Sequence, residues 1–123
     1  MARILIVDDS PTILNLIAEM LAQGDHEVLK AMDGEAAVQL TNQQQPDLVL
    51  LDVILPRLNG YQVCRQIKSS PETAQIPIIM ITRKAREKDR QWGVEQGADG
   101  YITKPFTATE LLETVGHLMA VAD

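Results

Sequence analysis

The chain has 123 residues, 46% of them hydrophobic, a formal net charge of −6 and a single cysteine. A chain of this length can bury a core as one domain, and one cysteine excludes an intramolecular disulfide. The acidic balance argues against general nucleic-acid binding, and Asp52 interrupts the longest apolar run, which argues against a membrane span. We therefore expect one cytoplasmic domain over residues 1–123, without a signal peptide.

Five apolar segments predict β-strands. The run at 4–7 is continuous, which indicates a strand covered on both faces, because a half-exposed strand alternates apolar and polar residues. The segments at 47–52 and 76–82 are also nearly continuous and favour central strands. Polar residues flank the short segment at 26–31, as in an edge strand, and a weaker fifth strand is expected at 99–103.

Five further segments have the apolar spacing of helices. The first has the clearest start, because Ser10 can cap it and Pro11 takes the first helical position, where a backbone N–H is not needed. Within the later helices, Trp92 is expected to pack over the fifth strand and Cys64 to be a small buried hydrophobe. The predicted helices cover residues 11–22, 33–45, 60–70, 84–96 and 107–121.

The alternation of strands and helices predicts an α/β domain, with helices on both faces of a parallel sheet. In such a doubly wound sheet all the strands end at one edge, and ligands bind there. Five polar side chains lie at or just after predicted strand ends. We expect these to share one rim: Asp8, Asp9, Asp52, Thr82 and Lys104.

The chemistry of this set points to a phosphoryl group. Neighbouring carboxylates raise one another's pKa unless a cation compensates, and Mg²⁺ prefers oxygen ligands such as carboxylates, water and phosphate. Lys104 adds a fixed positive charge, and the Thr82 hydroxyl can donate to a phosphate oxygen. A lone aspartate at a strand end is more simply a helix cap, but the joint placement of all five residues favours a functional site.

Two other classes of α/β protein are less consistent with the sequence. Phosphatases that use an aspartyl nucleophile need a second aspartate two residues further on, where this chain has Ile54. A flavin- or nucleotide-binding module requires a phosphate loop rich in Gly or Ser/Thr after the first strand. The segment "DDSPT" places negative charge there instead.

Four motifs, "VDDS", "LLDVILPRLNG", "IIMIT" and "GYITKPF", make the whole chain similar to CheY-like response-regulator receiver domains. The resemblance implies a flavodoxin-like (βα)5 fold, in which a doubly wound, five-stranded parallel sheet has the strand order 2-1-3-4-5. More narrowly, "MARILIVDDSPT" and "WGVEQGA" resemble a regulator of pilus-driven (twitching) motility in a chemosensory, chemotaxis-like pathway.

The resemblance also implies roles for the rim. Asp52 would accept a phosphoryl group from a histidine kinase, and Mg²⁺ would be held by Asp8, Asp9, Asp52 and the backbone carbonyl of Ile54. Lys104 would lie beside the phosphoryl group. A carboxylate can act as the nucleophile here, and the protein mainly aligns the groups and neutralises charge. We expect no enzyme activity beyond the protein's own phosphorylation and dephosphorylation.

A conformational switch follows from the same resemblance. Thr82 would move toward the phosphoryl oxygens and Tyr101 would rotate inward. This would remodel the face of the fourth helix, fifth strand and fifth helix, where a downstream protein target binds. A cis peptide bond is expected between Lys104 and Pro105.

Neighbouring positions are expected to tune rates or shape loops. In the family, the positions of Ile54 and Lys84 place or exclude hydrolytic water, and the apolar Ile54 predicts slow self-hydrolysis of the acyl phosphate. Arg83 stands where a small residue is usual, so it either hinders donor entry or attracts anionic donors. Pro56 and Gly60 are expected to shape the loop after the phospho-acceptor.

We expect a stand-alone regulator, because only one helix follows Lys104, and its output is then contact with another protein. It is expected to be a monomer or a weak dimer. This regulator either binds a pilus or motor component or serves as a phosphate sink for a shared kinase. A module that interacts independently of phosphorylation is a third alternative. The basic stretch at 83–90 is either a solvated helix face or a docking surface for an acidic partner.

Overall fold

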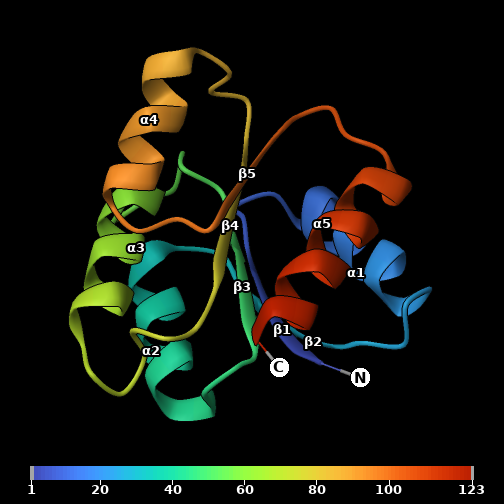
Figure 1. Ribbon diagram of the computed structural model, residues 1–123, viewed down its shortest axis with the longest axis horizontal. Helices are drawn as coiled ribbons and strands as arrows, with labels where there is room; N and C mark the ends of the chain where they lie inside the picture. Colours follow the sequence, from blue (N-terminus) through green and yellow to red (C-terminus); the bar gives the residue numbers. More distant parts are fainter. Residues whose placement is uncertain (1, 123) are drawn as a thin grey trace.

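The computed structural model describes residues 2–122, in which five β-strands alternate with five α-helices (Figure 1). The strands are β1 (Arg3–Val7), β2 (Glu27–Ala31), β3 (Leu48–Leu51), β4 (Ile78–Thr82) and β5 (Gly100–Thr103). The helices are α1 (Pro11–Ala22), α2 (Gly34–Gln44), α3 (Gly60–Ser69), α4 (Glu87–Glu95) and α5 (Ala108–Ala122). None of these helices has both the length and the apolar character that crossing a membrane requires.

All neighbouring strands are parallel and follow the order β2-β1-β3-β4-β5, which confirms the predicted flavodoxin-like fold. The central pairing places Ile4 beside Val28 of β2 on one side and beside Leu48 of β3 on the other. Because all strands run the same way, their carboxyl ends form one rim of the sheet. The turns that lead from each helix into the next strand lie at the opposite edge.

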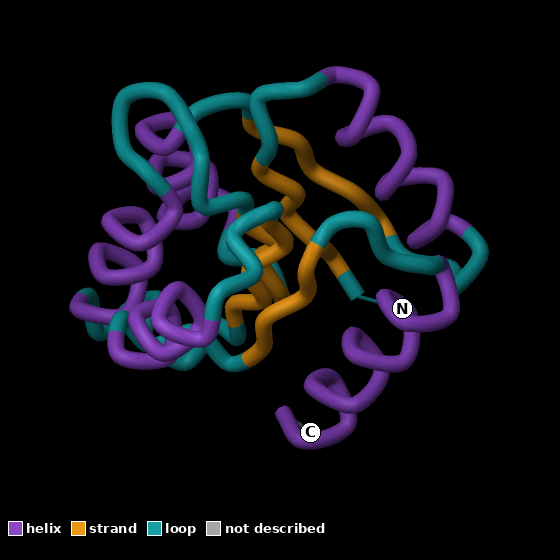
Figure 2. The backbone as a smooth tube through the Cα atoms, turned by 90° about the horizontal axis from the view of Figure 1, so that it is seen from above, coloured by secondary structure: helices purple, strands orange, loops and turns teal. Residues whose placement is uncertain are grey.

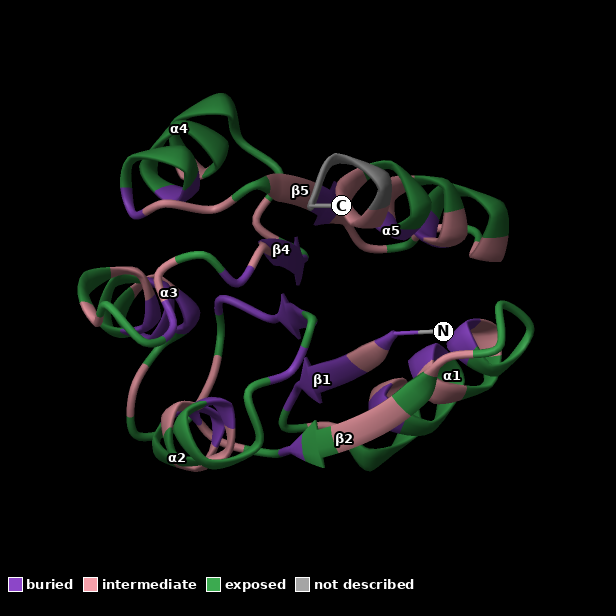
Figure 3. Ribbon diagram, turned by 60° about the horizontal axis from the view of Figure 1, so that its bottom comes forward, coloured by how far each residue is buried: buried purple, intermediate pink, exposed green. Residues whose placement is uncertain are grey.

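The sheet separates two hydrophobic cores. Helices α1 and α5 cover one face and α2, α3 and α4 cover the other, so that the strands form the middle layer (Figures 1 and 2). Successive strand residues point to opposite faces, so Ile4 and Ile6 belong to the α1–α5 core and Leu5 and Val7 to the other. The buried surfaces of strands and helices accordingly face inward (Figure 3).

Side-chain caps determine where the helices that border the rim begin. The predicted cap of α1 is confirmed: the Ser10 hydroxyl accepts the Ile13 amide at 3.3 Å, with Pro11 at the first helical position. At the start of α3, the side chains of Asn59 and Gln62 each accept the other's backbone amide at 3.0 Å. These caps satisfy amides that a helix start otherwise leaves unpaired.

Helix α4 begins at Glu87, three residues later than predicted. The Lys84 carbonyl before it accepts a hydrogen bond from the Tyr101 hydroxyl on β5 at 2.7 Å, so this segment stays in the loop. The first turn of α4 then carries Glu87 and Asp89, whose negative charges are favourable at a helix N-terminus.

The prediction for Trp92 was wrong, and the prediction for Cys64 is confirmed. Trp92 is 48% exposed and meets the Tyr61 ring edge-on, with ring centroids 6.4 Å apart. Gly93 faces β5 instead, because a Cβ at this position would lie 3.3 Å from the Tyr101 ring. Cys64 is fully buried, and its thiol donates to the Gln96 carbonyl at 3.3 Å.

Candidate functional site

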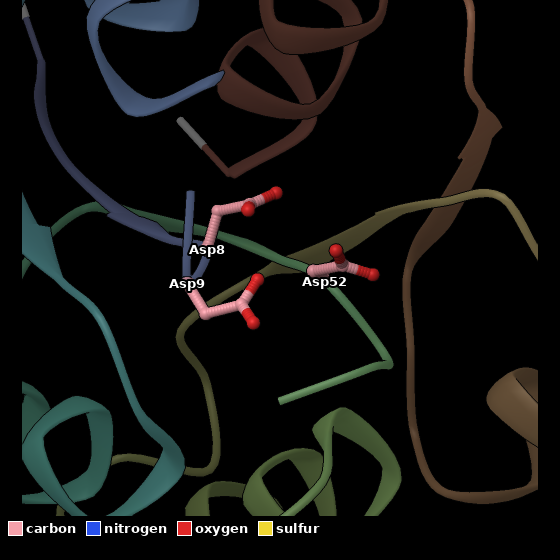
Figure 4. Close-up of side chains that lie close together, drawn as sticks. All are labelled: Asp8, Asp9 and Asp52. Carbon is pink, nitrogen blue, oxygen red and sulfur yellow. The ribbon is translucent and has the colours of Figure 1, made fainter. Parts of the chain in front are cut away.

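Three aspartates meet at the rim (Figure 4). Asp8 and Asp9 directly follow β1 and Asp52 directly follows β3, and one oxygen from each lies within 4.8 Å of the others. Asp8 and Asp52 are buried, whereas Asp9 is exposed. The structure therefore brings the three predicted carboxylates into one cluster that opens to solvent on the Asp9 side.

Asp8 is the most constrained carboxylate of the cluster. Its Oδ1 accepts the Ser10 amide at 3.0 Å and its Oδ2 accepts the Lys104 ammonium at 2.7 Å. Burial raises the pKa of Asp8 above its ordinary value, and the hydrogen bonds from Lys104 and Ser10 offset this only in part. The charged form of Asp8 therefore depends on a positively charged partner.

Lys104 supplies that charge from the loop after β5. Its Nζ also lies 3.0 Å from Asp52 Oδ2, and 11% of its side chain is exposed. Burial opposes the charged form, but the hydrogen bonds to Asp8 and Asp52 outweigh burial and raise the Lys104 pKa. The Lys104 amide donates to the Thr82 carbonyl at 2.9 Å, and the following bond to Pro105 is cis.

A cleft of about 330 Å³ opens above the cluster. Arg83 and Ile54 form part of its wall, and both are exposed. Within residues 2–119, the Arg83 guanidinium forms no ion pair, although the cleft contains three carboxylates. The full lining of the cleft is Asp8, Asp9, Ser10, Thr12, Ile13, Asp52, Ile54, Arg83 and Lys104.

The loop between β3 and α3 is fixed against the end of β3. The Ile54 amide donates to Asp52 Oδ1 at 3.1 Å, which orients both the carboxylate and the Ile54 peptide. At the other end of the loop, the Gly60 amide donates to the Val53 carbonyl at 2.8 Å. A Cβ on Gly60 would come within 2.7 Å of Val53 Cα, so this close approach requires glycine.

Thr82 and Tyr101 lie behind the cluster. Thr82 is fully buried and does not line the cleft; its hydroxyl accepts the Lys84 amide at 3.4 Å. The half-buried Tyr101 donates to the Lys84 carbonyl, and burial raises its pKa above the ordinary value. The two residues are therefore linked through the backbone of a single residue, Lys84.

Sequence reasoning missed Tyr61 on α3. Its hydroxyl donates to the Asp89 carbonyl of α4 at 3.0 Å. Burial raises the pKa of Tyr61, and the neighbouring Tyr101 hydroxyl offsets this only in part. The only available signal was an aromatic residue directly after Gly60, which also fits an ordinary core position. Tyr61 thus connects α3 to the start of α4.

Comparison with known proteins agrees with this fold. The chain matches the model of the response regulator receiver domain over residues 4–116. It is 48% identical to protein PilH of Pseudomonas aeruginosa over 120 residues, which cover 98% of this chain and 99% of PilH.

Solved structures give the same result. The chemotaxis response regulator CheY4 of Vibrio cholerae superposes with a TM-score of 0.90 at 30% identity, covering 95% of this chain and 98% of that one. The receiver domain of the P. aeruginosa sensor histidine kinase PA1611 also has a TM-score of 0.90, at 32% identity, covering 97% and 98%. That crystal structure has a magnesium ion coordinated in the active site cleft. The predicted resemblance is confirmed, and the chain belongs to the response regulator receiver domain family.

Proposed function

We propose that this protein is a signalling switch that accepts a phosphoryl group on Asp52 from a histidine kinase. Receiver domains accept phosphoryl groups from such kinases and interact with downstream targets. One observation carries the assignment to Asp52: this carboxylate directly follows the central strand β3, lies 3.0 Å from the Lys104 ammonium and lines the cleft together with Asp8 and Asp9. The cleft above it gives a donor access.

The proposed transfer needs little covalent chemistry from the protein. An Asp52 carboxylate oxygen attacks phosphorus and forms a P–O bond, while the donor's P–N bond breaks and its electron pair stays on the kinase imidazole. Lys104 neutralises charge on the phosphoryl oxygens and keeps the group oriented. Asp52 is itself modified, so the protein catalyses only its own phosphorylation and dephosphorylation.

The donor set of the rim suits Mg²⁺. Receiver domains bind Mg²⁺ at an acidic pocket, and here three carboxylates face a single bridging ammonium, which leaves an excess of negative charge. We assign as ligands Asp8, Asp9, Asp52 and the backbone carbonyl of Ile54. When bound, the ion supplies positive charge that neutralises phosphoryl oxygens.

The proposed switch acts through the loop after β4. A phosphoryl group on Asp52 offers the Thr82 hydroxyl a stronger acceptor, so Thr82 moves and the Lys84 amide loses its partner. Tyr101 donates to the same residue's carbonyl, so its position changes with the loop. This alters the face formed by α4, β5 and α5, to which we assign the downstream target.

The pathway assignment rests on the relative of nearly equal length. Identity of 48% to PilH across almost both chains supports a role in signalling to pilus-driven motility in the cytoplasm. Arg83 and Lys84 border the cleft and the switch loop, and with Ile54 we assign them to the tuning of phosphorylation and hydrolysis rates.

The test is the intact mass of the protein after incubation with Mg²⁺ and acetyl phosphate. Wild type is expected to gain one phosphoryl group, and Asp52→Asn none. Asp47→Asn is the matched control, because Asp47 is exposed and precedes β3, at the opposite edge of the sheet. Equal modification of wild type and Asp52→Asn would overturn the assignment, as would an unmodified wild type after incubation with an active histidine kinase.

A further inference from the structure

The β3–α3 loop, residues 53–59, crosses the start of α2 in a contact that requires a glycine. Gly34 is the first residue of α2 and is buried. A Cβ built on Gly34 would overlap the Leu58 carbonyl oxygen and lie 2.6 Å from Leu58 Cβ. The Gly34 amide also donates to the Pro56 carbonyl at 3.3 Å. The loop and the helix start are thus in direct backbone contact.

Two ion pairs connect the loop to the start of α2, one on each side of Gly34 in the sequence. Arg57 lies between the two loop residues that meet Gly34, in the left-handed region at φ 71°. Its guanidinium reaches the two neighbours of Gly34, with Nε 3.9 Å from Asp33 Oδ2 and Nη1 3.8 Å from Glu35 Oε2. A non-glycine residue at positive φ is held there by its surroundings, and these contacts form part of them.

The loop packs on the core through Val53 and Leu55, whereas the residue between them and the two residues after them face solvent. Ile54 is 55% exposed, and Pro56 and Arg57 are exposed as well. The course of the loop is therefore set by the core packing of Val53 and Leu55 and by backbone contacts, at Asp52 and Gly60 at its ends and at Gly34 in between. A displacement of Leu58 away from α2 is therefore expected to displace Ile54 as well, because both belong to the same short loop.

We propose that Gly34 is a positioning residue for the Mg²⁺ site. By letting the loop lie against the start of α2, it holds the Ile54 peptide, whose amide donates to Asp52 Oδ1, at the cleft. The inference rests on the proposed function in one respect, that the Ile54 carbonyl is a ligand. Gly34 itself touches neither the cluster nor the cleft.

The first test compares Gly34→Ala with wild type by Mg²⁺ titration, followed through backbone amide NMR signals. A methyl group at this position displaces backbone atoms, so we expect Mg²⁺ to bind about tenfold or more weakly, as when groups that orient metal ligands are altered. Gly116→Ala is the matched control, because nothing lies within 4 Å of a Cβ added there. Urea unfolding of each variant gives its folded fraction, so that the dissociation constant refers to folded protein.

The second test uses Arg57→Glu, which replaces an exposed side chain and leaves the core intact. The new carboxylate repels Asp33 and Glu35, so the loop lifts from α2 and Mg²⁺ binding weakens. A purely electrostatic effect has the opposite sign, because added negative charge near a cation site strengthens binding. Arg65→Glu, on the exposed side of α3, measures that electrostatic effect alone.

These outcomes decide the inference. Weaker Mg²⁺ binding by folded Gly34→Ala and by Arg57→Glu supports it, and wild-type affinity in either folded variant overturns it. If Gly34→Ala does not fold, Arg57→Glu alone decides. Wild-type protein that binds Mg²⁺ but is not phosphorylated on Asp52 would contradict the proposed function and leave this inference standing. Wild-type protein that binds no Mg²⁺ would overturn both.

Discussion

Lys104 Nζ lies 2.7 Å from Asp8 Oδ2 and 3.0 Å from Asp52 Oδ2, so one ammonium connects the ends of β1 and β3. The loop after β5 is thereby tied to the centre of the sheet. The same ammonium that is proposed to stabilise the phosphoryl group also balances the carboxylates before phosphorylation.

Replacing Lys104 is expected to separate its effect on stability from its effect on phosphorylation. In Lys104→Met without Mg²⁺, Asp8 and Asp52 lose their common partner, and the free energy of unfolding should fall by about 2 kcal/mol at neutral pH. Added Mg²⁺ should raise the melting temperature more than in wild type, because it then compensates an unneutralised cluster, while phosphorylation becomes slower. Thermal melts with and without Mg²⁺ check this. Lys30→Met, which removes an exposed Lys30–Asn15 hydrogen bond, should behave as wild type in both.

Ile54 is expected to prolong the life of the acyl phosphate. Its exposed apolar side chain lines the cleft and cannot orient a water molecule for attack on phosphorus. Ile54→Asn should therefore shorten the lifetime on the order of tenfold, below the full effect of a general base. The measurement is the decay of phosphorylated protein by intact mass. Val94→Asn provides the control at another exposed apolar position, and an unchanged lifetime in Ile54→Asn would refute the hypothesis.

Tyr101→Phe is expected to weaken the link between β5 and the switch loop. Loss of the hydrogen bond to the Lys84 carbonyl should lower the free energy of unfolding by about 1 kcal/mol. The change of the Lys84 amide signal on phosphorylation should also become smaller. Urea unfolding and amide NMR spectra measure the two effects. Tyr61→Phe serves as comparison, because it removes a hydrogen bond to α4 and leaves the Lys84 carbonyl bonded. Equal Lys84 responses in all three proteins would contradict the proposed linkage.

Because the Cys64 thiol is buried, we expect the protein to lose stability in alkaline solution. Burial raises the pKa of this thiol from 9.0 to about 11. Between these values the folded protein keeps a proton that the unfolded chain releases, so stability falls as pH rises from about 9 and levels off above about 11. The full loss above pH 11 amounts to about 3 kcal/mol. Urea unfolding of wild type and Cys64→Ala at pH 8, 9, 10 and 11 isolates the effect, because all other ionisable groups are shared. If the free energy of unfolding falls equally with pH in both proteins, the Cys64 thiol does not contribute to the loss.

The acidic rim could be predicted because the pair Asp8–Asp9 and the single Asp52 each follow an apolar run that forms a strand, which is visible in the sequence. The fold followed from strict alternation, and the strand order from the family motifs. The ion pairs of Lys104 could not be predicted, since its sequence position gives the rim but not the oxygens that the side chain reaches. Before phosphorylation, these oxygens belong to Asp8 and Asp52.

Contacts between elements that are distant in the sequence could not be predicted for a related reason. Tyr61 and the Asp89 carbonyl are 28 residues apart, and no periodic pattern connects them. Gly34 could be interpreted only as part of a helix start, because nothing in the sequence indicates which backbone passes over it. Trp92 was assigned to the wrong face because a nine-residue helix with few apolar residues gives a weak orientation, and the small Gly93 takes the inner position.

The polarity of the sheet has a practical consequence for protein engineering. The phosphoryl chemistry is assigned to one edge, whereas the exposed turn at Gln23–Asp25, between α1 and β2, lies at the opposite edge. Exposed turns of this kind tolerate insertions. A fluorescent reporter domain inserted there would lie away from the rim and the switch loop, so the chain offers a scaffold for a genetically encoded sensor of kinase activity.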